Sequence, residues 1–218
     1  MRNRNTELVF ILDRSGSMAG LEEDTIGGFN SMLRKNKNLH EGEAIVSTVL
    51  FDNVTEILHD RVPADMVPYM TDRDYYVRGC TALYDAVGGA IDHIADIHRY
   101  ARPDDVPRNT MFVIMTDGME NASRYYNRAQ IKRMIEHQRN RYGWEFVFIS
   151  ANIDAGETAE SIGIGRDDAV DYIADKQGTR IAYEAATSRV EATRMGRPRE
   201  DRTWRKKIDR DYRTRSKK

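Results

Sequence analysis

Five oxygen-bearing side chains in three separate segments have the chemistry of a metal site. Asp13, Ser15 and Ser17 alternate with other residues directly after an apolar run. Thr81 precedes an amphipathic stretch, and Asp117 follows a second apolar run. Carboxylate and hydroxyl oxygens are hard ligands, which suit Mg²⁺, Mn²⁺ or Ca²⁺ rather than Zn²⁺ or copper. These residues therefore predict a divalent-metal site, with Mg²⁺ as the first candidate.

The charge of this set predicts what the ion would do. The two carboxylates, Asp13 and Asp117, only balance the two positive charges of the ion, and the three hydroxyls are neutral. An ion held in this way still attracts one more anionic oxygen. That oxygen would come from water or from a carboxylate of a partner protein.

Short apolar runs predict a sheet whose strands are covered on both faces, because near-continuous Val, Ile, Leu and Phe are typical of buried parallel strands. One further run alternates polar and apolar residues and follows the second strand after only Asp52 and Asn53. That spacing predicts a hairpin and an antiparallel edge strand. The predicted strands are Leu8–Leu12, Ala44–Phe51, Val54–His59, Thr110–Thr116, Glu145–Ala151 and, with a weaker pattern, Ala169–Ile173.

Amphipathic stretches alternate with these strands, in residues 21–35, 83–98, 128–139 and 179–190. The expected order of elements includes one more helix, without assigned residues, between the last two strands. The alternation predicts an α/β fold, namely a three-layer, doubly wound and mostly parallel sheet of Rossmann type with one antiparallel edge strand. Ligands of such sheets bind beyond the carboxyl ends of the strands, where the strand order reverses. Asp13 and Asp117 are expected to face each other there.

Together the three segments resemble the metal-ion-dependent adhesion site of von Willebrand factor type A (vWA) domains. The likeness rests on Asp-x-Ser-x-Ser, a Thr in a later loop and Thr-Asp-Gly, and it covers roughly residues 6 to 190 in element order. It implies a stand-alone domain of bacterial type in which Ser15, Ser17 and Thr81 contact the metal through hydroxyls, while Asp13 and Asp117 bind directly or through water. It also implies capture of an acidic side chain of a protein partner. The chain is thus expected to be a binding module and not an enzyme.

Other interpretations of these residues are possible. Short polar residues after a strand often only form an Asx turn or cap a helix. An EF-hand loop would need glycine where Met18 stands. The main alternative is a Mg²⁺-dependent phosphoryl-transfer or hydrolase domain. Against it, Ser15 occupies the position where such enzymes commonly carry a second acid. Such chemistry would also need a base at the site. None of the five histidines is expected to lie there, namely His40, His59, His93, His98 and His137.

Residues around the predicted site have two interpretations each. Tyr75, Tyr76 and Arg78 are of types enriched in protein-binding hot spots, but the tyrosines could equally pin their loop onto the sheet. Cys80 is interpreted as a packing residue of a tight loop. Further candidates for the rim are Met18, Glu120 and Asn121.

Charge divides the 218-residue chain into two parts. Residues 189–218 carry 13 Lys or Arg against 5 Asp or Glu, a net of +8, and residues 1–188 carry 21 against 30, a net of −9. We therefore assign residues 1–195 to the vWA-like domain and residues 196–218 to a basic, mobile tail whose removal should cost little stability. The acidic body argues against nucleic-acid binding and leaves the tail as the candidate for such contacts.

Cysteine usage and hydropathy predict the location of the protein. Cys80 is the only cysteine, so no internal disulfide can form, as in reducing compartments. The five apolar residues that follow the basic start are too few for a signal-peptide core, and no run is long enough to span a membrane. The expected location is the cytoplasm.

Overall fold

The computed structural model describes residues 5–39 and 42–216. Within them, six strands form one sheet in the order β3-β2-β1-β4-β5-β6. Neighbouring strands are parallel except β2 and β3, which are antiparallel at one edge. This confirms the predicted α/β sheet with one antiparallel edge strand. The strands are β1 (Thr6–Asp13), β2 (Ala44–Phe51), β3 (Thr55–Pro63), β4 (Asn109–Thr116), β5 (Glu145–Ser150) and β6 (Ala169–Asp171).

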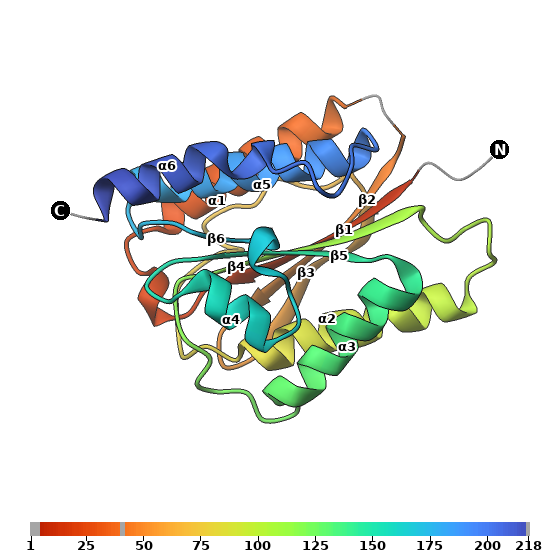
Figure 1. Cartoon of the computed structure of the whole chain (residues 1–218), viewed down its shortest axis with the longest axis horizontal. Coiled ribbons are helices and arrows are strands. Elements are labelled where there is room, and N and C mark those ends of the chain that lie inside the picture. Colours follow the sequence, from red (N-terminus) through yellow and green to blue (C-terminus); the bar gives the residue numbers. More distant parts are fainter. Residues whose placement is uncertain (1–4, 40–41, 217–218) are drawn as a thin grey trace.

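Helices cover both faces of the sheet and make three layers (Figure 1). One layer contains α1 (Glu22–Lys37), α5 (Lys176–Arg194) and α6 (Lys206–Arg215), and the other contains α2 (Leu83–Tyr100), α3 (Arg128–Tyr142) and α4 (Ala155–Ser161). Short 3-10 turns occur at η1 (Gly16–Met18), η2 (Arg166–Asp168) and η3 (Thr203–Arg205). No helix among the described residues is both long enough and apolar enough to cross a membrane.

Burial on both faces of the sheet explains why residues 8–12 of β1 are all apolar. Leu8, Phe10 and Leu12 pack in the core on the side of α1 and α5. Val9 and Ile11 pack in the core on the side of α2 and α3. All five are at most 1% exposed, because successive strand residues point to opposite faces and both faces are covered by helices.

The helix α4 lies between β5 and β6, where the predicted order of elements includes a helix whose residues the sequence did not assign. It has only seven residues, and it is fixed by Asp154, whose carboxylate accepts the backbone N–H of Glu157 at 2.7 Å. Its buried face consists of two small residues, Ala155 and Ala159. Two alanines in seven residues are too weak an apolar pattern to indicate a helix.

Both edges of the sheet are irregular or short. The pairing of β2 with β3 changes register on either side of Thr48. Arg61 in β3 has a φ of 52°, in the left-handed region that a side chain seldom adopts. At the other edge β6 has only three residues. Regular pairing is therefore concentrated in β1, β2, β4 and β5, which carry the candidate site.

The C-terminal segment corrects the expectation of a mobile tail beyond residue 195. Trp204 and Ile208 are 4% and 1% exposed and belong to the core on the side of α1 and α5. The segment therefore packs on α5 and β6 as an integral part of the domain. Two bulky apolar side chains four residues apart are enough to anchor one face of a short helix.

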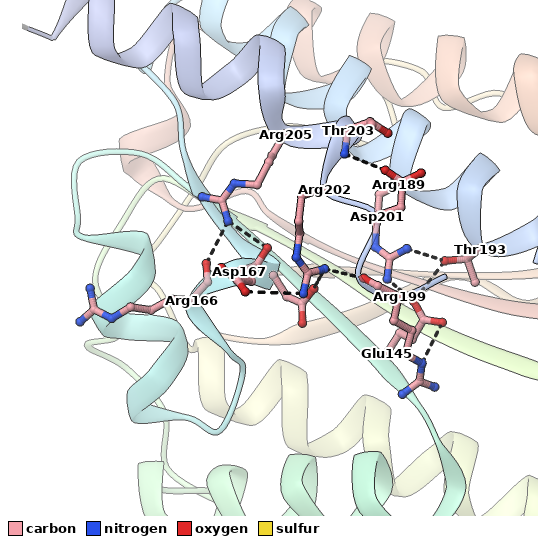
Figure 2. Close-up of polar contacts among 11 residues, drawn as sticks. Glu145, Arg166, Asp167, Arg189, Thr193, Arg199, Asp201, Arg202, Thr203 and Arg205 are labelled. Carbon is pink, nitrogen blue, oxygen red and sulfur yellow. Dashed lines mark hydrogen bonds and ion pairs between the residues drawn. The ribbon is translucent and has the colours of Figure 1, made fainter. Parts of the chain in front are cut away.

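Opposite charges add to this docking, as Figure 2 shows. Arg199 Nε lies 3.5 Å from Glu145 Oε1, and Arg202 Nη1 lies 3.0 Å from Asp168 Oδ1. Arg205 donates to the backbone carbonyl of residue 167 at 2.9 Å. The basic segment thus pairs with the acidic body, which is why its net charge does not keep it in solvent.

Candidate metal centre

The topology places the two predicted aspartates side by side. β1 pairs with β4 in parallel, and Leu12 lies opposite Met115. Asp13 is the last residue of β1, and Asp117 directly follows the end of β4. The chain leaves β1 toward β2 on one side, and β4 lies on the other side, so the crevice between the two ends is the place where such sheets bind ligands.

Hydrogen bonds connect the aspartates to the serines. Asp13 Oδ1 accepts the backbone N–H of Ser15 at 2.7 Å, and Asp13 Oδ2 accepts the hydroxyl of Thr116 at 2.5 Å. The hydroxyls of Ser15 and Ser17 lie 3.0 Å apart, and Ser17 donates to Asp117 Oδ1. Thr116 was not singled out from the sequence, although it belongs to the Thr-Asp-Gly segment.

Thr81 completes the group through its position beside Gly118. A Cβ atom at residue 118 would lie 3.1 Å from both Ser17 Oγ and Thr81 Oγ1, and 4.0 Å from Ser15 Oγ. A side chain at this position would push the hydroxyls of Ser17 and Thr81 aside by a few tenths of an ångström, so glycine favours their close approach. The structure therefore brings together all the predicted residues, Asp13, Ser15, Ser17, Thr81 and Asp117.

Burial makes the two carboxylates electrostatically costly. Asp13 and Asp117 are each 1% exposed. Burial raises the pKa of Asp13 above its ordinary value, against the lowering effect of hydrogen bonds from Ser15 and Thr116. The pKa of Asp117 is raised to about 6, because burial and the charge of Asp13 together outweigh the lowering effect of the hydrogen bond from Ser17. A cation between the two carboxylates would offset this cost.

The donor set fits a hard divalent cation. Asp117 Oδ2 is buried and has no hydrogen-bond partner, although buried carboxylate oxygens normally have one. The hydroxyls of Ser17, Ser15 and Thr81, which gather around Asp117 and Gly118, are neutral oxygen donors. No cluster of three or more His, Cys, Asp or Glu suited to a metal occurs among residues 5–39 and 42–216. The two carboxylates with their hydroxyls are therefore the candidate site in this part of the chain.

Asp52 joins the loops that carry the candidate ligands. Its Oδ2 accepts Nε of Arg14 at 2.8 Å and Nε of Arg78 at 2.7 Å. The backbone N–H of Arg78 donates to the carbonyl of Arg14 at 2.9 Å. Burial tends to raise the pKa of Asp52, but bonds from Arg78, from the N–H of Val54 and from Arg14 bring it below the ordinary value. One carboxylate thus links the loop of Ser15 and Ser17 to the segment before Thr81.

Two asparagines fix the loop of Thr81 from either side. Asn53 Oδ1 accepts the backbone N–H of Cys80 at 2.6 Å. Asn121 Oδ1 accepts the backbone N–H of Thr81 at 2.9 Å, and the N–H of Asn121 donates to the Thr81 carbonyl at 3.0 Å. No local pattern in the sequence indicates these contacts, because the two partners are 27 and 40 residues apart along the chain.

We expect Asp52→Ala to lower the free energy of unfolding by on the order of 3 kcal/mol, because it leaves the fully buried Arg14 guanidinium without its buried partner. Glu56→Ala is the matched control. Glu56 also pairs with Arg14, at 2.7 Å, but its side chain is 48% exposed, so its loss should cost less than about 1 kcal/mol. Urea unfolding followed by circular dichroism measures both. Equal losses in the two variants would contradict the linking role of Asp52.

The rim residues separate into buried and exposed groups. Tyr75 is 1% exposed and its hydroxyl donates to the carbonyl of Asp13 at 2.5 Å, so it pins the loop. Tyr76 is 44% exposed, with the guanidinium of Arg78 over its ring at 5.2 Å. Met18 is buried, whereas Met119, which the sequence did not indicate, is 71% exposed. Tyr76, Arg78 and Met119 are therefore available to a partner at this face.

Glu120 is engaged within the protein rather than open to a partner. Its Oε2 accepts the backbone N–H of Tyr84 at 3.0 Å and the hydroxyl of Ser123 at 2.7 Å. Its Oε1 accepts the backbone N–H groups of Ala122 and Ser123 at 2.9 and 2.8 Å. This carboxylate therefore holds the loop after β4 against the start of α2.

Comparison with known proteins supports the fold. No family model and no curated protein matches the sequence. Among solved structures, the proximal thread matrix protein 1 of the mussel byssus, with a zinc-occupied MIDAS motif, has a TM-score of 0.58 at 14% identity over 88% of this chain and 47% of its own. A von Willebrand factor type A protein from Catenulispora acidiphila has a TM-score of 0.56 at 12% identity, over 87% of this chain and 43% of its own. The chain has a vWA-like fold.

A third vWA protein, the ArnB paralog VWA2 from Sulfolobus acidocaldarius, has a TM-score of 0.52 at 18% identity over 84% of this chain and 45% of its own. The vWA-like chain spans about half the length of these solved proteins. At such identities the likeness concerns the fold. The chemistry of the site therefore has to be argued from its own side chains.

Proposed function

We propose that this chain is a divalent-metal-dependent protein-binding module. The ion would be held by Asp13, Ser15, Ser17, Thr81 and Asp117, and it would capture an acidic side chain of a partner protein. The observation that carries the proposal is the buried Asp117 Oδ2, which lacks a hydrogen-bond partner although Asp13 and three hydroxyls belong to the same group of side chains. The lack of a hydrogen-bond partner is explained if this buried oxygen binds a cation.

Mg²⁺ is the ion that we propose, with Mn²⁺ and Ca²⁺ as alternatives. All the candidate donors are oxygens, and only two of them carry charge, which suits small hard cations. When bound, the ion would supply a Lewis-acidic contact for an anionic oxygen from outside the protein. Zinc at the MIDAS motif of the byssus protein shows that a neighbour in fold can hold a metal there. The ion held by this chain is to be measured directly.

A binding role is favoured over Mg²⁺-dependent phosphoryl transfer or hydrolysis. Such chemistry commonly uses an additional acid or base beside the metal. Position 15 is a serine, and the contacts of the histidines within the described residues lie elsewhere. His59 bonds with Thr48, His93 with Asp60 and His98 with Glu7, and His137 packs on Tyr142, while His40 lies outside the described residues. A phosphatase screen with Mg²⁺ tests this alternative.

The basic C-terminal segment supports a protein partner over nucleic acid. Arginines that would contact phosphates instead pair with the body, as Arg202 does with Asp168 and Arg215 with Asp175. Cytoplasmic location belongs to the same proposal, because Cys80 is an exposed free thiol.

Thr81→Ala should weaken partner binding roughly tenfold while the fold stays intact, because it removes a neutral ligand and no charge pair. The immobilised chain is incubated with cell lysate in Mg²⁺ or in EDTA, and retained proteins are identified by mass spectrometry. Specific partners should be lost in EDTA. Ser123→Ala, which removes a hydroxyl of the same face outside the site, is the control and should retain them.

The recovered partner then allows a sharper test. Glu→Gln or Asp→Asn at its contact should cost about as much affinity as EDTA does, since both remove the same ionic contact. Binding that survives EDTA and Thr81→Ala together would contradict the proposal. Tyr76 and Arg78 would then be the candidates for a metal-free interface.

A further inference from the structure

A groove at the opposite end of the sheet from the metal centre has the features of a second ligand site. It has a volume of about 550 Å³ and lies between α2 and α3, beside the residues that lead into β4 and β5. This volume is within the range of small-molecule sites. Ile91, Met134 and Trp144 give it apolar walls. The Trp144 ring is fixed, because it stacks on Phe112 with centroids 5.4 Å apart.

Positive charge surrounds the groove. Arg99, Arg108 and Arg133 line it, together with two histidines, and Asp92 is its one lining carboxylate among the described residues. Asp92 is engaged as an acceptor for the hydroxyl of Tyr126 at 2.7 Å. No described residue forms an ion pair with the side chain of Arg108 or Arg133. Unpaired guanidinium groups around an apolar groove favour an anionic ligand, and their planar donor pattern matches phosphate.

Gln138 supplies an independent sign of a missing partner. It lines the same groove, is 7% exposed, and its Oε1 is buried without a hydrogen-bond partner. A buried carboxamide oxygen normally accepts a hydrogen bond. A glutamine carboxamide can pair with the edge of adenine, accepting from the exocyclic amine and donating to the neighbouring ring nitrogen. Tyr142, which is 61% exposed at the groove, offers a ring on which a base can stack.

From these three features we infer that the groove binds an adenine nucleotide of the size of a nucleoside monophosphate. The phosphate is bound by Arg108 and Arg133, and the base is recognised by Gln138 and Tyr142. The site is independent of the metal centre, because the two lie at opposite ends of β4, whose eight residues span roughly 23 Å at about 3.3 Å per residue. Nucleotide binding in the groove therefore requires no residue of the metal centre.

Isothermal titration calorimetry of the full chain with AMP tests this inference, and EDTA is added so that the metal centre takes no part. Saturable binding of one AMP per chain is expected. Arg133→Ala should weaken it roughly tenfold, because a charge-assisted bond to phosphate is lost. Lys132→Ala is the matched control on the same helix. Lys132 does not line the groove and pairs with Glu136 at 4.0 Å, so the change should be below twofold.

Gln138→Met distinguishes recognition of the base from a structural role. The variant keeps the length of the side chain and removes the unpaired carbonyl, so it should weaken AMP binding without lowering the melting temperature of the free protein. Adenosine and inorganic phosphate alone should each bind more weakly than AMP. The inference is overturned by the absence of saturable heat at millimolar AMP, by equal losses in Arg133→Ala and Lys132→Ala, or by unchanged AMP affinity in Gln138→Met.

Discussion

Mg²⁺ at about one hundred times its Kd should raise the melting temperature of the wild-type chain by about 5–10 °C, and Asp117→Asn should abolish that rise. Binding at this excess adds about 2.7 kcal/mol by mass action. For a domain of this size each kcal/mol corresponds to roughly 2–4 °C. Asp117 carries the buried oxygen without a partner, so its loss removes a charged donor that the other four side chains do not replace.

The same variant has a second expected property, measured in EDTA. Without metal, Asp117→Asn should melt no lower than wild type, because the buried Asp117 carboxylate is unfavourable beside Asp13 and its pKa is raised to about 6. Glu157→Gln, which removes an exposed carboxylate near the same end of the sheet, should keep the full response to Mg²⁺. A full response in Asp117→Asn would show that the ion binds elsewhere.

Removal of the chain from Gly196 onward should destabilise the domain by more than about 5 kcal/mol. Trp204→Ala alone should cost about 3–5 kcal/mol, because the indole is 4% exposed in the core. The truncation also removes Ile208 and leaves Glu145 without Arg199. This loss is comparable to the whole stability of a typical domain, so much of the truncated protein should be unfolded.

Urea unfolding followed by circular dichroism measures the loss, with Lys207→Ala as the control. Lys207 pairs with Glu184 on the surface, and both side chains are at least one-third exposed, so this change should cost less than about 1 kcal/mol. A truncated chain that unfolds at the same urea concentration as the full chain would show that α6 contributes no stability.

The sheet and the grouping of the candidate metal ligands could be predicted because their signals are local. The central strands are apolar runs, β1 ends in Asp13, and Asp117 directly follows β4. Parallel winding then requires the two ends to meet. Neither the recognition of the strands nor the pairing of their ends requires knowledge of a particular long-range side-chain contact.

The docked C-terminal segment could not be predicted from charge and apolar content. Its composition is that of a solvated tail, and the decisive residues are few. Trp204, Ile208 and Tyr212 are spaced by four, which places them on one face of a helix, and this spacing was the signal available. Net charge alone did not decide between a solvated tail and a basic segment that binds the acidic body of the same chain.

The buried link through Arg14 and Asp52 had no signal in the sequence. An arginine between two candidate metal ligands is expected to point into solvent. Its complete burial depends on Asp52 and Glu56, which reach it only after the hairpin of β2 and β3 has formed. Contacts of this kind are decided by tertiary packing rather than by local pattern.

The irregular edge strands of the sheet affect how the molecule can associate with other proteins. An exposed, regular strand offers a row of unpaired backbone groups to any extended chain, and this is a common route to aggregation. At one edge, the pairing of β3 with β2 changes register around Thr48, and Arg61 has a left-handed conformation. The same strand carries the charged residues Glu56 and Asp60. At the other edge, β6 has only three residues. Neither gives a template for strand addition. Copies of the chain should therefore resist growing into fibrils edge to edge, and partners are expected to approach the loops and helices.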